Sequence, residues 1–176
     1  MRTISKSIVA AVAAMAVMAL GASAASATIT PTTGAVTATS TGAVTLHSTL
    51  LDDNCSTLNF SGDINMDNAA GLGGGGIITG WSPSGCLIPP TGTFTTPWTL
   101  NINSHVSGNT WTGTVTNVNV DISFCHFTGS LGLDYDNSTG RLTLNSGSLS
   151  GGACGAGSIV GSWDLTGPGG VIPQAS

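Results

Sequence analysis

The side chains best suited to chemistry in this sequence are four cysteines, three histidines and eight aspartates. The histidines stand far apart, at His47, His105 and His126, and no His-x-x-x-His or Cys-x-x-Cys spacing occurs. Zinc sites usually draw two ligands from one short motif of that kind. We therefore interpret the histidines as surface or half-buried residues, and we expect neither a metal site nor a cofactor.

Enzymatic hydrolysis would need a nucleophile, a base and a group that stabilises the oxyanion. The sequence contains no Gly-x-Ser-x-Gly turn and no glutamate, and its one lysine, Lys6, lies near the N-terminus. Aspartate and histidine are then the remaining candidate bases. We predict that the protein is not an enzyme.

A calcium loop is the strongest metal-binding alternative. Asp134-Tyr-Asp136-Asn137, followed by Gly140, places hard oxygen ligands on alternate positions. The segment lacks the bidentate carboxylate that closes such a loop. A tight turn explains the same residues, so we favour a turn and keep calcium as the alternative.

Residues 1–27 have the features of a secretory signal. Arg2 and Lys6 supply the charged start, residues 8–20 the apolar stretch, and Ala25-Ser-Ala27 a small-residue cleavage site. The apolar stretch is short for a membrane span, and no second one of transmembrane length follows. We predict that the signal is removed and that residues 28–176 form a single secreted β domain with no transmembrane segment.

The cysteines belong to a repeated pattern. The phrase FSGDINMDNAAG at 60–71 returns more loosely as FTGSLGLDYDNSTG at 127–140, and each copy lies between two cysteines. Four cysteines in an exported protein favour disulfides, with three possible pairings. The similar spacing within the two copies favours pairs that each close their own hairpin, namely Cys55 with Cys86 and Cys125 with Cys154.

Charge and composition narrow the function and the fold. After the signal, one basic residue, Arg141, stands against eight aspartates, which gives a net charge near −7. That balance argues against nucleic acid or an anionic membrane as a partner. The chain after the signal has no lysine or glutamate and is rich in Thr, Ser, Asn, Gly and Val, a composition typical of strands and turns.

Apolar residues alternate along several segments, which puts each set on one face of a strand. The sets are Leu58, Phe60, Ile64 and Met66; Trp98, Leu100 and Ile102; Leu131, Leu133 and Tyr135; Ile159, Trp163 and Leu165. Further strands are predicted at 34–39, 43–50, 76–81, 111–123 and 141–145. About eight to ten short strands predict an all-β, antiparallel β-sandwich or barrel-like fold with two disulfide-stapled hairpin units.

Two further segments are interpreted as connections. GLGGGG at 71–76 lacks the lysine of a phosphate-binding loop and is interpreted as a flexible link. WSPSGCLIPP at 81–90 is rich in proline, which disfavours a central strand. Its Trp81, Leu87 and Ile88 either cap the core or face outward. We favour the core because large apolar side chains usually bury; outward, they would form an apolar contact surface.

Several segments together resemble one known family. They are TPTTGAVTATSTGAVTL, GCLIPPTGTFTTPWTLNI, CHFTGSLGLDYDNSTGRLTL and GGACGAGSIVGSWDLT, which follow the signal in that order. The pattern resembles the secreted protein activator of alkane oxidation family, of pseudomonad type. The resemblance implies a small extracellular accessory protein, without catalytic residues, that promotes growth on or uptake of long-chain alkanes. It also implies structural roles for the four cysteines and for Pro97-Trp98.

Two functions are compatible with these features. The first is an accessory role at the cell surface or at an oil–water interface, with alkane or another hydrophobic surface as the partner. The alternative is a structural subunit of an extracellular filament or biofilm matrix. In that case residues 28–42 would pair with a sheet edge of a neighbouring copy.

Overall fold

The computed structural model describes residues 33–66, 74–88, 97–170, 173 and 175. These residues form strands and two single turns of 3₁₀ helix, and no helix among them is long and apolar enough to cross a membrane. The all-β prediction is confirmed. The elements are β1 (Thr33–Ser40), β2 (Val44–Ser48), β3 (Asp52–Asn65), β4 (Gly74–Cys86), β5 (Trp98–Ser107), β6 (Thr110–Ile122), β7 (Cys125–Asp136), β8 (Arg141–Ser150), η1 (Gly152–Cys154), β9 (Ala156–Thr166) and η2 (Pro168–Gly170).

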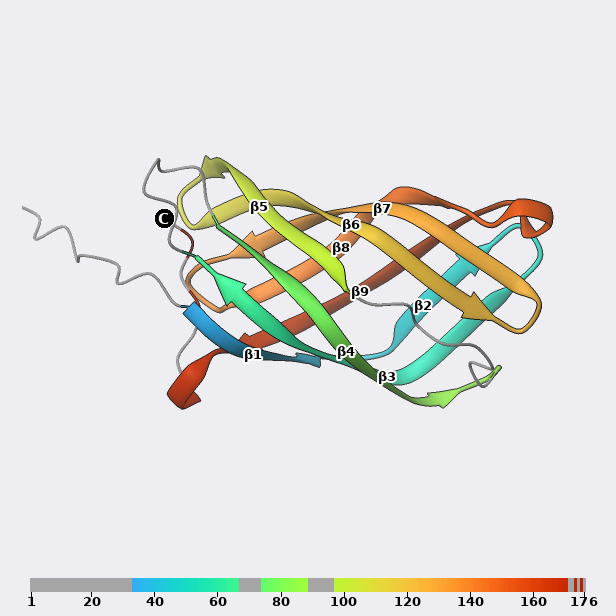
Figure 1. Ribbon diagram of the computed structural model, residues 1–176, viewed down its shortest axis with the longest axis horizontal. Helices are drawn as coiled ribbons and strands as arrows, with labels where there is room; N and C mark the ends of the chain where they lie inside the picture. The colour runs from blue at the N-terminus through green and yellow to red at the C-terminus, as the bar shows by residue number, and fades with distance from the viewer. Residues whose placement is uncertain (1–32, 67–73, 89–96, 171–172, 174, 176) are drawn as a thin grey trace, which may run out of the picture.

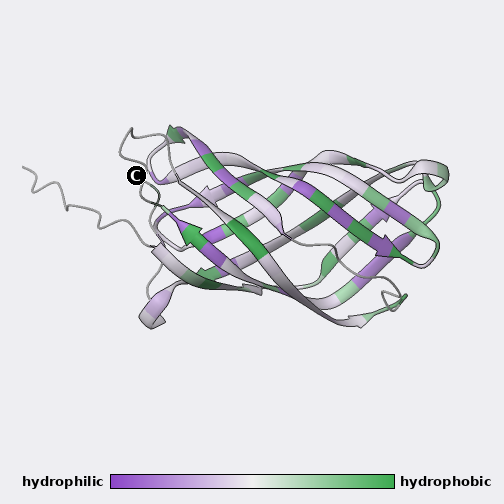
Figure 2. Cartoon of the chain, viewed as in Figure 1, coloured by the Kyte–Doolittle hydropathy of each residue, from purple (hydrophilic) through white to green (hydrophobic). Residues whose placement is uncertain are grey.

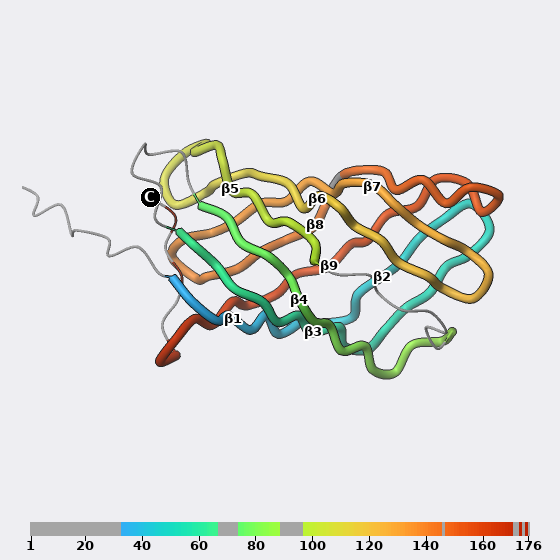
Figure 3. Tube along the Cα trace, in the orientation of Figure 1, coloured from blue at the N-terminus to red at the C-terminus, as the bar shows by residue number. Residues whose placement is uncertain are grey.

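The strands form one antiparallel sheet that closes on itself. The order is β1-β3-β2-β9-β8-β7-β6-β5-β4, and β4 pairs with β3 to complete the circuit. β1 and β2 share one position between β3 and β9, because each of them pairs with a different part of both neighbours. The result is an elongated barrel (Figures 1 and 3), which confirms the barrel-like form of the prediction.

Alternating apolar side chains fill the interior of the barrel. All four sets predicted from the sequence are buried. At the centre, the Phe60 ring lies 5.8 Å from the Trp98 ring and 5.2 Å from the Trp163 ring, measured between centroids. The Trp163 indole N–H donates a hydrogen bond to the Leu58 carbonyl, so its burial leaves no unsatisfied donor. Figure 2 shows the resulting alternation of hydrophobic and hydrophilic residues along the strands.

β4 corrects two interpretations made from the sequence. Gly74–Gly76 are not part of a flexible link, because Gly75 and Gly76 pair with both β3 and β5, and Gly74 pairs with β5. A Cβ on Gly76 would lie 2.5 Å from the Asp63 carbonyl oxygen, so glycine permits this close approach. The strand then continues to Cys86, through part of the segment interpreted as a loop. Pro83 is tolerated because the β5 ladder covers only Gly74–Ile78, and no β5 ladder bond depends on the missing Pro83 N–H.

The predicted disulfides are confirmed. Cys55 and Cys86 are direct cross-strand partners on β3 and β4, and their sulfurs are bonded. Cys125, at the start of β7, is bonded to Cys154 in η1, which follows β8. Each bond therefore closes the open end of one hairpin, β3–β4 or β7–β8.

The second copy of the repeat forms the turn that the sequence predicts. The Asp136 Oδ1 atom accepts hydrogen bonds from the Ser138 N–H at 2.7 Å and from the Ser138 hydroxyl at 2.6 Å. Gly140 adopts a φ of 70°, which suits glycine. The corresponding turn of the first copy, residues 67–71, lies outside the described residues.

Candidate hydrophobic contact site at the disulfide end

The interior leaves little room for a ligand. An apolar cavity of about 40 Å³ lies beside the Phe60, Trp98 and Trp163 rings. Small-molecule pockets usually measure about 300–1,000 Å³. Among the described residues this interior space is too small for a long-chain ligand, so a contact with one would involve the outer surface.

The two ends of the barrel differ in what their connections carry. We call one the disulfide end. It comprises the β2–β3 turn, the end of β4, the β6–β7 turn and η1, which strand pairing brings together (Figure 1). We call the other the opposite end; it comprises the β5–β6 and β7–β8 turns and the described C-terminal residues.

Three large apolar side chains are exposed at the disulfide end, one on each of three separate connections. Leu50 is 64% exposed in the β2–β3 turn, Leu87 is 76% exposed after β4, and Phe124 is 79% exposed in the β6–β7 turn. We call these three residues the apolar tips. The other exposed large apolar residues in the described parts of the chain are Ile77 and Val160 on the strands and Val106 near the opposite end. Figure 2 shows hydrophobic colour at the turns of the disulfide end.

Turn geometry explains why Leu50 and Phe124 project. Leu50 lies in a tight turn in which the Ser48 N–H donates to the Leu51 carbonyl at 2.8 Å. Phe124 lies in the two-residue connection between the paired residues Ile122 and Cys125. Neither side chain has a strand face to bury against, so both point into solvent.

Turn chemistry does not explain the choice of leucine and phenylalanine there. Tight hairpin turns favour Gly, Asn, Asp and Ser, whose side chains suit the local backbone. Folding would be served as well by a polar residue at either position. Large apolar residues at exposed loop positions are therefore candidates for contact with a partner.

Each of these two hairpins carries a histidine–aspartate pair next to its tip. The His47 Nδ1 atom contacts the Asp52 carboxylate across β2 and β3, and the His126 Nδ1 atom contacts the Asp121 carboxylate across β6 and β7. In both pairs the two residues are direct cross-strand partners. Leu50 and Phe124 are thus each flanked by such a pair, and we call these two pairs the polar, partly acidic rim of the apolar tips. Arg141, the one basic residue of the described chain, lies at the opposite end.

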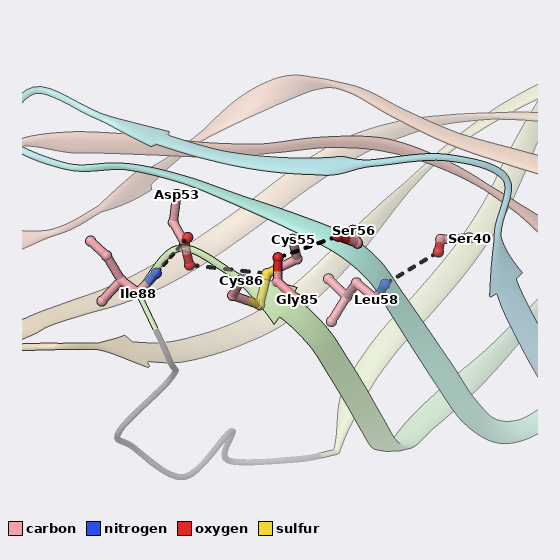
Figure 4. The surroundings of a disulfide bond; sticks show 8 residues. All are labelled: Ser40, Asp53, Cys55, Ser56, Leu58, Gly85, Cys86 and Ile88. Carbon is pink, nitrogen blue, oxygen red and sulfur yellow. Dashed lines mark hydrogen bonds between the residues drawn. A yellow bond between two sulfur atoms is a disulfide. The ribbon is translucent and has the colours of Figure 1, made fainter.

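The third tip, Leu87, is held by the chain on both sides. Cys86 is bonded to Cys55, and the Ile88 N–H donates a hydrogen bond to the Asp53 Oδ1 atom at 3.0 Å (Figure 4). Asp53 itself is buried, with 1% of its surface exposed.

The structure gives different environments to the three residues that the sequence marked as candidates for the core or for contact, namely Trp81, Leu87 and Ile88. Trp81 and Ile88 are half-buried and pack against the core, as favoured. For Leu87 the core interpretation is wrong, because the side chain is exposed. Leu50 and Phe124 were missed. The signal that could have revealed them is a large apolar residue inside a very short connection between alternating segments.

The potential metal ligands have other partners. Among the described residues, the one group of three close ligand atoms is Asp53, Cys55 and Cys86, and both of its cysteines are oxidised. The His105 Nε2 atom lies 2.9 Å from the Gly108 carbonyl oxygen, away from the other two histidines. In the segment considered for calcium, Asp136 bonds Ser138 and Asp134 accepts from the Asn145 amide. The turn accounts for the Asp136 contacts, and the Asp134 contact joins β7 to β8.

The fold and the site together define a small disulfide-bonded β-barrel protein with a filled interior and exposed apolar side chains at one end. Residues 1–167 match the family model described as alkane oxidation protein activator, PraA/PraB-like, and the chain belongs to that family. The family is described as an activator of alkane oxidation rather than as an oxidising enzyme. Searches of curated proteins and of solved structures gave no significant match.

Proposed function

We propose that this protein is a secreted, non-enzymatic accessory factor that promotes growth on long-chain alkanes by adsorbing to hydrocarbon at the oil–water interface. The observation that carries the proposal is the gathering of the apolar tips at one end of the barrel. Family membership supplies the link to alkane oxidation. The filled interior supports contact on the outer surface over transport inside the protein.

Three apolar side chains are enough for reversible adsorption. Complete burial of a leucine or phenylalanine contributes about 1.5–3 kcal/mol. Three such contacts, reduced by the cost of fixing the orientation of the molecule, give a net gain of a few kcal/mol. The protein would therefore bind and leave a droplet without unfolding.

The barrel wall suits the aqueous side of such an interface. Its outward positions are occupied largely by Thr, Ser and Asn; for example, the Thr143 and Ser162 hydroxyls lie 3.0 Å apart across β8 and β9. One apolar end and a polar wall make the molecule amphiphilic along its length. The acidic rim of the tips, with no lysine or arginine nearby in the described parts of the chain, favours an uncharged hydrocarbon over an anionic membrane as the partner.

Adsorption to hexadecane droplets tests the proposal directly. Oxidised mature protein would be mixed with droplets, and the loss of protein from the aqueous phase measured against a droplet-free sample. We expect a triple variant, Leu50→Ser, Leu87→Ser and Phe124→Ser, to adsorb much more weakly than the parent protein. The matched control is the pair Val106→Ser and Val160→Ser, which removes exposed apolar side chains elsewhere and should adsorb like the parent.

Two outcomes would overturn the proposal. One is adsorption of the triple variant that equals adsorption of the parent protein. The other is assembly into polymers, seen by light scattering, with no loss of protein to the droplets. The second result would favour a filament subunit. In the structure Thr37 and Ala38, part of the segment predicted to reach a neighbour, already pair with both β3 and β9 of their own chain, and Thr39 and Ser40 pair with β9.

A further inference from the structure

Leu87 differs from the other two apolar tips in the way it is held. Leu50 and Phe124 each sit in a hairpin turn whose own strand pairs fix the geometry. Leu87 follows the last residue of β4, beyond the register that β4 shares with β3, which ends at Cys55 and Cys86. An exposed side chain in such a place would ordinarily be free to turn inward, so its outward position needs a specific cause.

Two anchors flank Leu87 in the structure. On its N-terminal side, Cys86 is tied to β3 by the disulfide with Cys55. On its C-terminal side, the Ile88 N–H is bonded to Asp53, and the Ile88 side chain packs against the core. Asp53 and Ile88 are 35 residues apart in sequence, so this hydrogen bond is a tertiary contact and not part of a local turn.

The chain reaches these anchors through Gly85. Gly85 has a φ of 61°, and a Cβ there would lie 2.5 Å from the Ser56 Oγ atom. Glycine is therefore required both by the backbone conformation and by the close approach of β3. Figure 4 shows the Asp53 side chain reaching Ile88 on the far side of the disulfide from Gly85.

A buried aspartate at position 53 would lower the stability of the protein if the side chain served packing alone. A buried polar group lowers stability unless hydrogen bonds compensate for its lost hydration. The Asp53 Oδ2 atom lies 4.0 Å from the Cys55 sulfur, which carries no proton in the disulfide and so donates no hydrogen bond. The hydrogen bond that compensates for burial of the carboxyl group is the one donated by the Ile88 N–H.

We propose that Asp53 is a positioning residue that, together with the Cys55–Cys86 disulfide, fixes Leu87 in its outward orientation for contact with hydrocarbon. With Cys86 and Ile88 both held toward the barrel, Leu87 between them points away from it. Fixing the side chain before contact reduces the ordering cost at the interface. This inference rests on the proposed function, because it assigns a cause to one of the three contacts.

The test combines substitutions at Asp53 and Leu87 with droplet adsorption. Leu87→Ser should weaken adsorption by about tenfold, as expected when one leucine is withdrawn from oil. Asp53→Ala should weaken it by a similar factor, and the double variant should be no weaker than Leu87→Ser alone. Asp53→Asn keeps an oxygen acceptor for the Ile88 N–H and should restore adsorption to near the parent level.

Amide hydrogen exchange at Ile88 provides a readout that does not depend on oil. Asp53→Ala should accelerate that exchange, and Asp53→Asn should leave it close to the parent rate. If Asp53→Ala does not fold, Asp53→Ser replaces it in both measurements. The serine side chain is polar but too short to keep the acceptor beside the Ile88 N–H. The matched control is Asn137→Ala, which removes a similar side-chain contact with the backbone at the opposite end and should change neither reading.

The outcomes distinguish this inference from the proposed function. If Leu87→Ser adsorbs weakly but Asp53→Ala adsorbs like the parent, Asp53 is not a positioning residue and the interfacial function stands. If Asp53→Ala loses adsorption without faster exchange at Ile88, the positioning mechanism is wrong. If Leu87→Ser adsorbs like the parent, Leu87 does not contact the hydrocarbon. That result would overturn both the role proposed for Leu87 and the positioning role of Asp53.

Discussion

The two ends of the barrel use different residues for the same task of reversing the chain. At the opposite end, the turns contain residues that suit their backbone, such as Gly108-Asn109 and the Asp136-bonded turn that ends at Gly140. At the disulfide end, the turns contain Leu50 and Phe124, which their turns do not require. Folding explains the first set of residues and leaves the second unexplained. The difference supports the proposal that the disulfide end is the contact surface.

The ends also differ in how they are held together. Two disulfides fasten the disulfide end. The opposite end relies on hydrogen bonds to the C-terminal residues: the Asn137 amide donates to the Ala175 carbonyl at 2.8 Å and accepts from the Ala175 N–H at 2.9 Å. The Tyr135 hydroxyl donates to the Pro173 carbonyl, and burial raises the pKa of this hydroxyl. Covalent bonds therefore hold the end that carries the apolar tips.

Loss of a disulfide should produce the largest change in stability. Replacing Cys125 and Cys154 with alanine opens a closed loop, and the chain-entropy model gives a cost of about 3–4 kcal/mol for a loop of this length. Urea unfolding of the variant and of the parent protein, both fully oxidised, measures the difference. A decrease below about 1 kcal/mol would mean that the covalent bond is not what holds this end together.

Loss of the Asn137 contacts should produce an intermediate change at the opposite end. Asn137→Ala leaves a buried N–H and a buried carbonyl of Ala175 without these partners, which costs about 1–3 kcal/mol each when no replacement forms. We expect lower stability in urea but unchanged adsorption to hexadecane droplets. Weakened adsorption in the folded variant would contradict the division of roles between the ends.

Polar residues at the two turn tips should leave stability almost unchanged. Leu50→Asn and Phe124→Asn place a turn-forming residue where the structure buries nothing, so the free energy of unfolding should shift by no more than about 0.5 kcal/mol. Adsorption should nevertheless decrease. Thermal unfolding and droplet depletion on the same samples separate the two effects. A large loss of stability would show that these side chains serve folding after all.

The smallest change in stability should come from replacing Asp136, and it should be visible at low pH. Hydrogen bonds from the Ser138 hydroxyl and N–H lower the pKa of this carboxyl group. Because the folded-state pKa lies below the unfolded value, the contribution to stability is present above the unfolded pKa, about 3.9, and is lost as the pH falls through the folded pKa. When unfolding is measured between pH 5 and pH 2, the free energy of unfolding should decrease less steeply in Asp136→Asn than in the parent protein. An identical slope in both proteins would contradict this.

Local features of this fold could be predicted from the sequence because their causes are local. Alternation identified the inward faces that carry Phe60, Trp98 and Trp163, since side chains on a strand alternate between its two faces. The repeated phrase indicated the disulfide pairs. The glycine run and Pro83 were misassigned, because whether a glycine or a proline interrupts a strand depends on which neighbours the strand has.

The site itself depended on the tertiary structure. Leu50, Leu87 and Phe124 lie in three distant parts of the sequence, and no local pattern connects them. Strand direction and register bring their connections to one end. Likewise, the bond between Asp53 and Ile88 exists only because β3 and β4 are paired.

The sequence by itself thus determined the class of structure, the faces of the strands, the disulfide pairs and the family. Only the tertiary structure decided that the sheet closes, that β1 and β2 share one position, and that the apolar tips meet at the disulfide end. The physical reason is that hydrophobic periodicity fixes which side of a strand is buried, whereas strand partners and register are set by non-local packing.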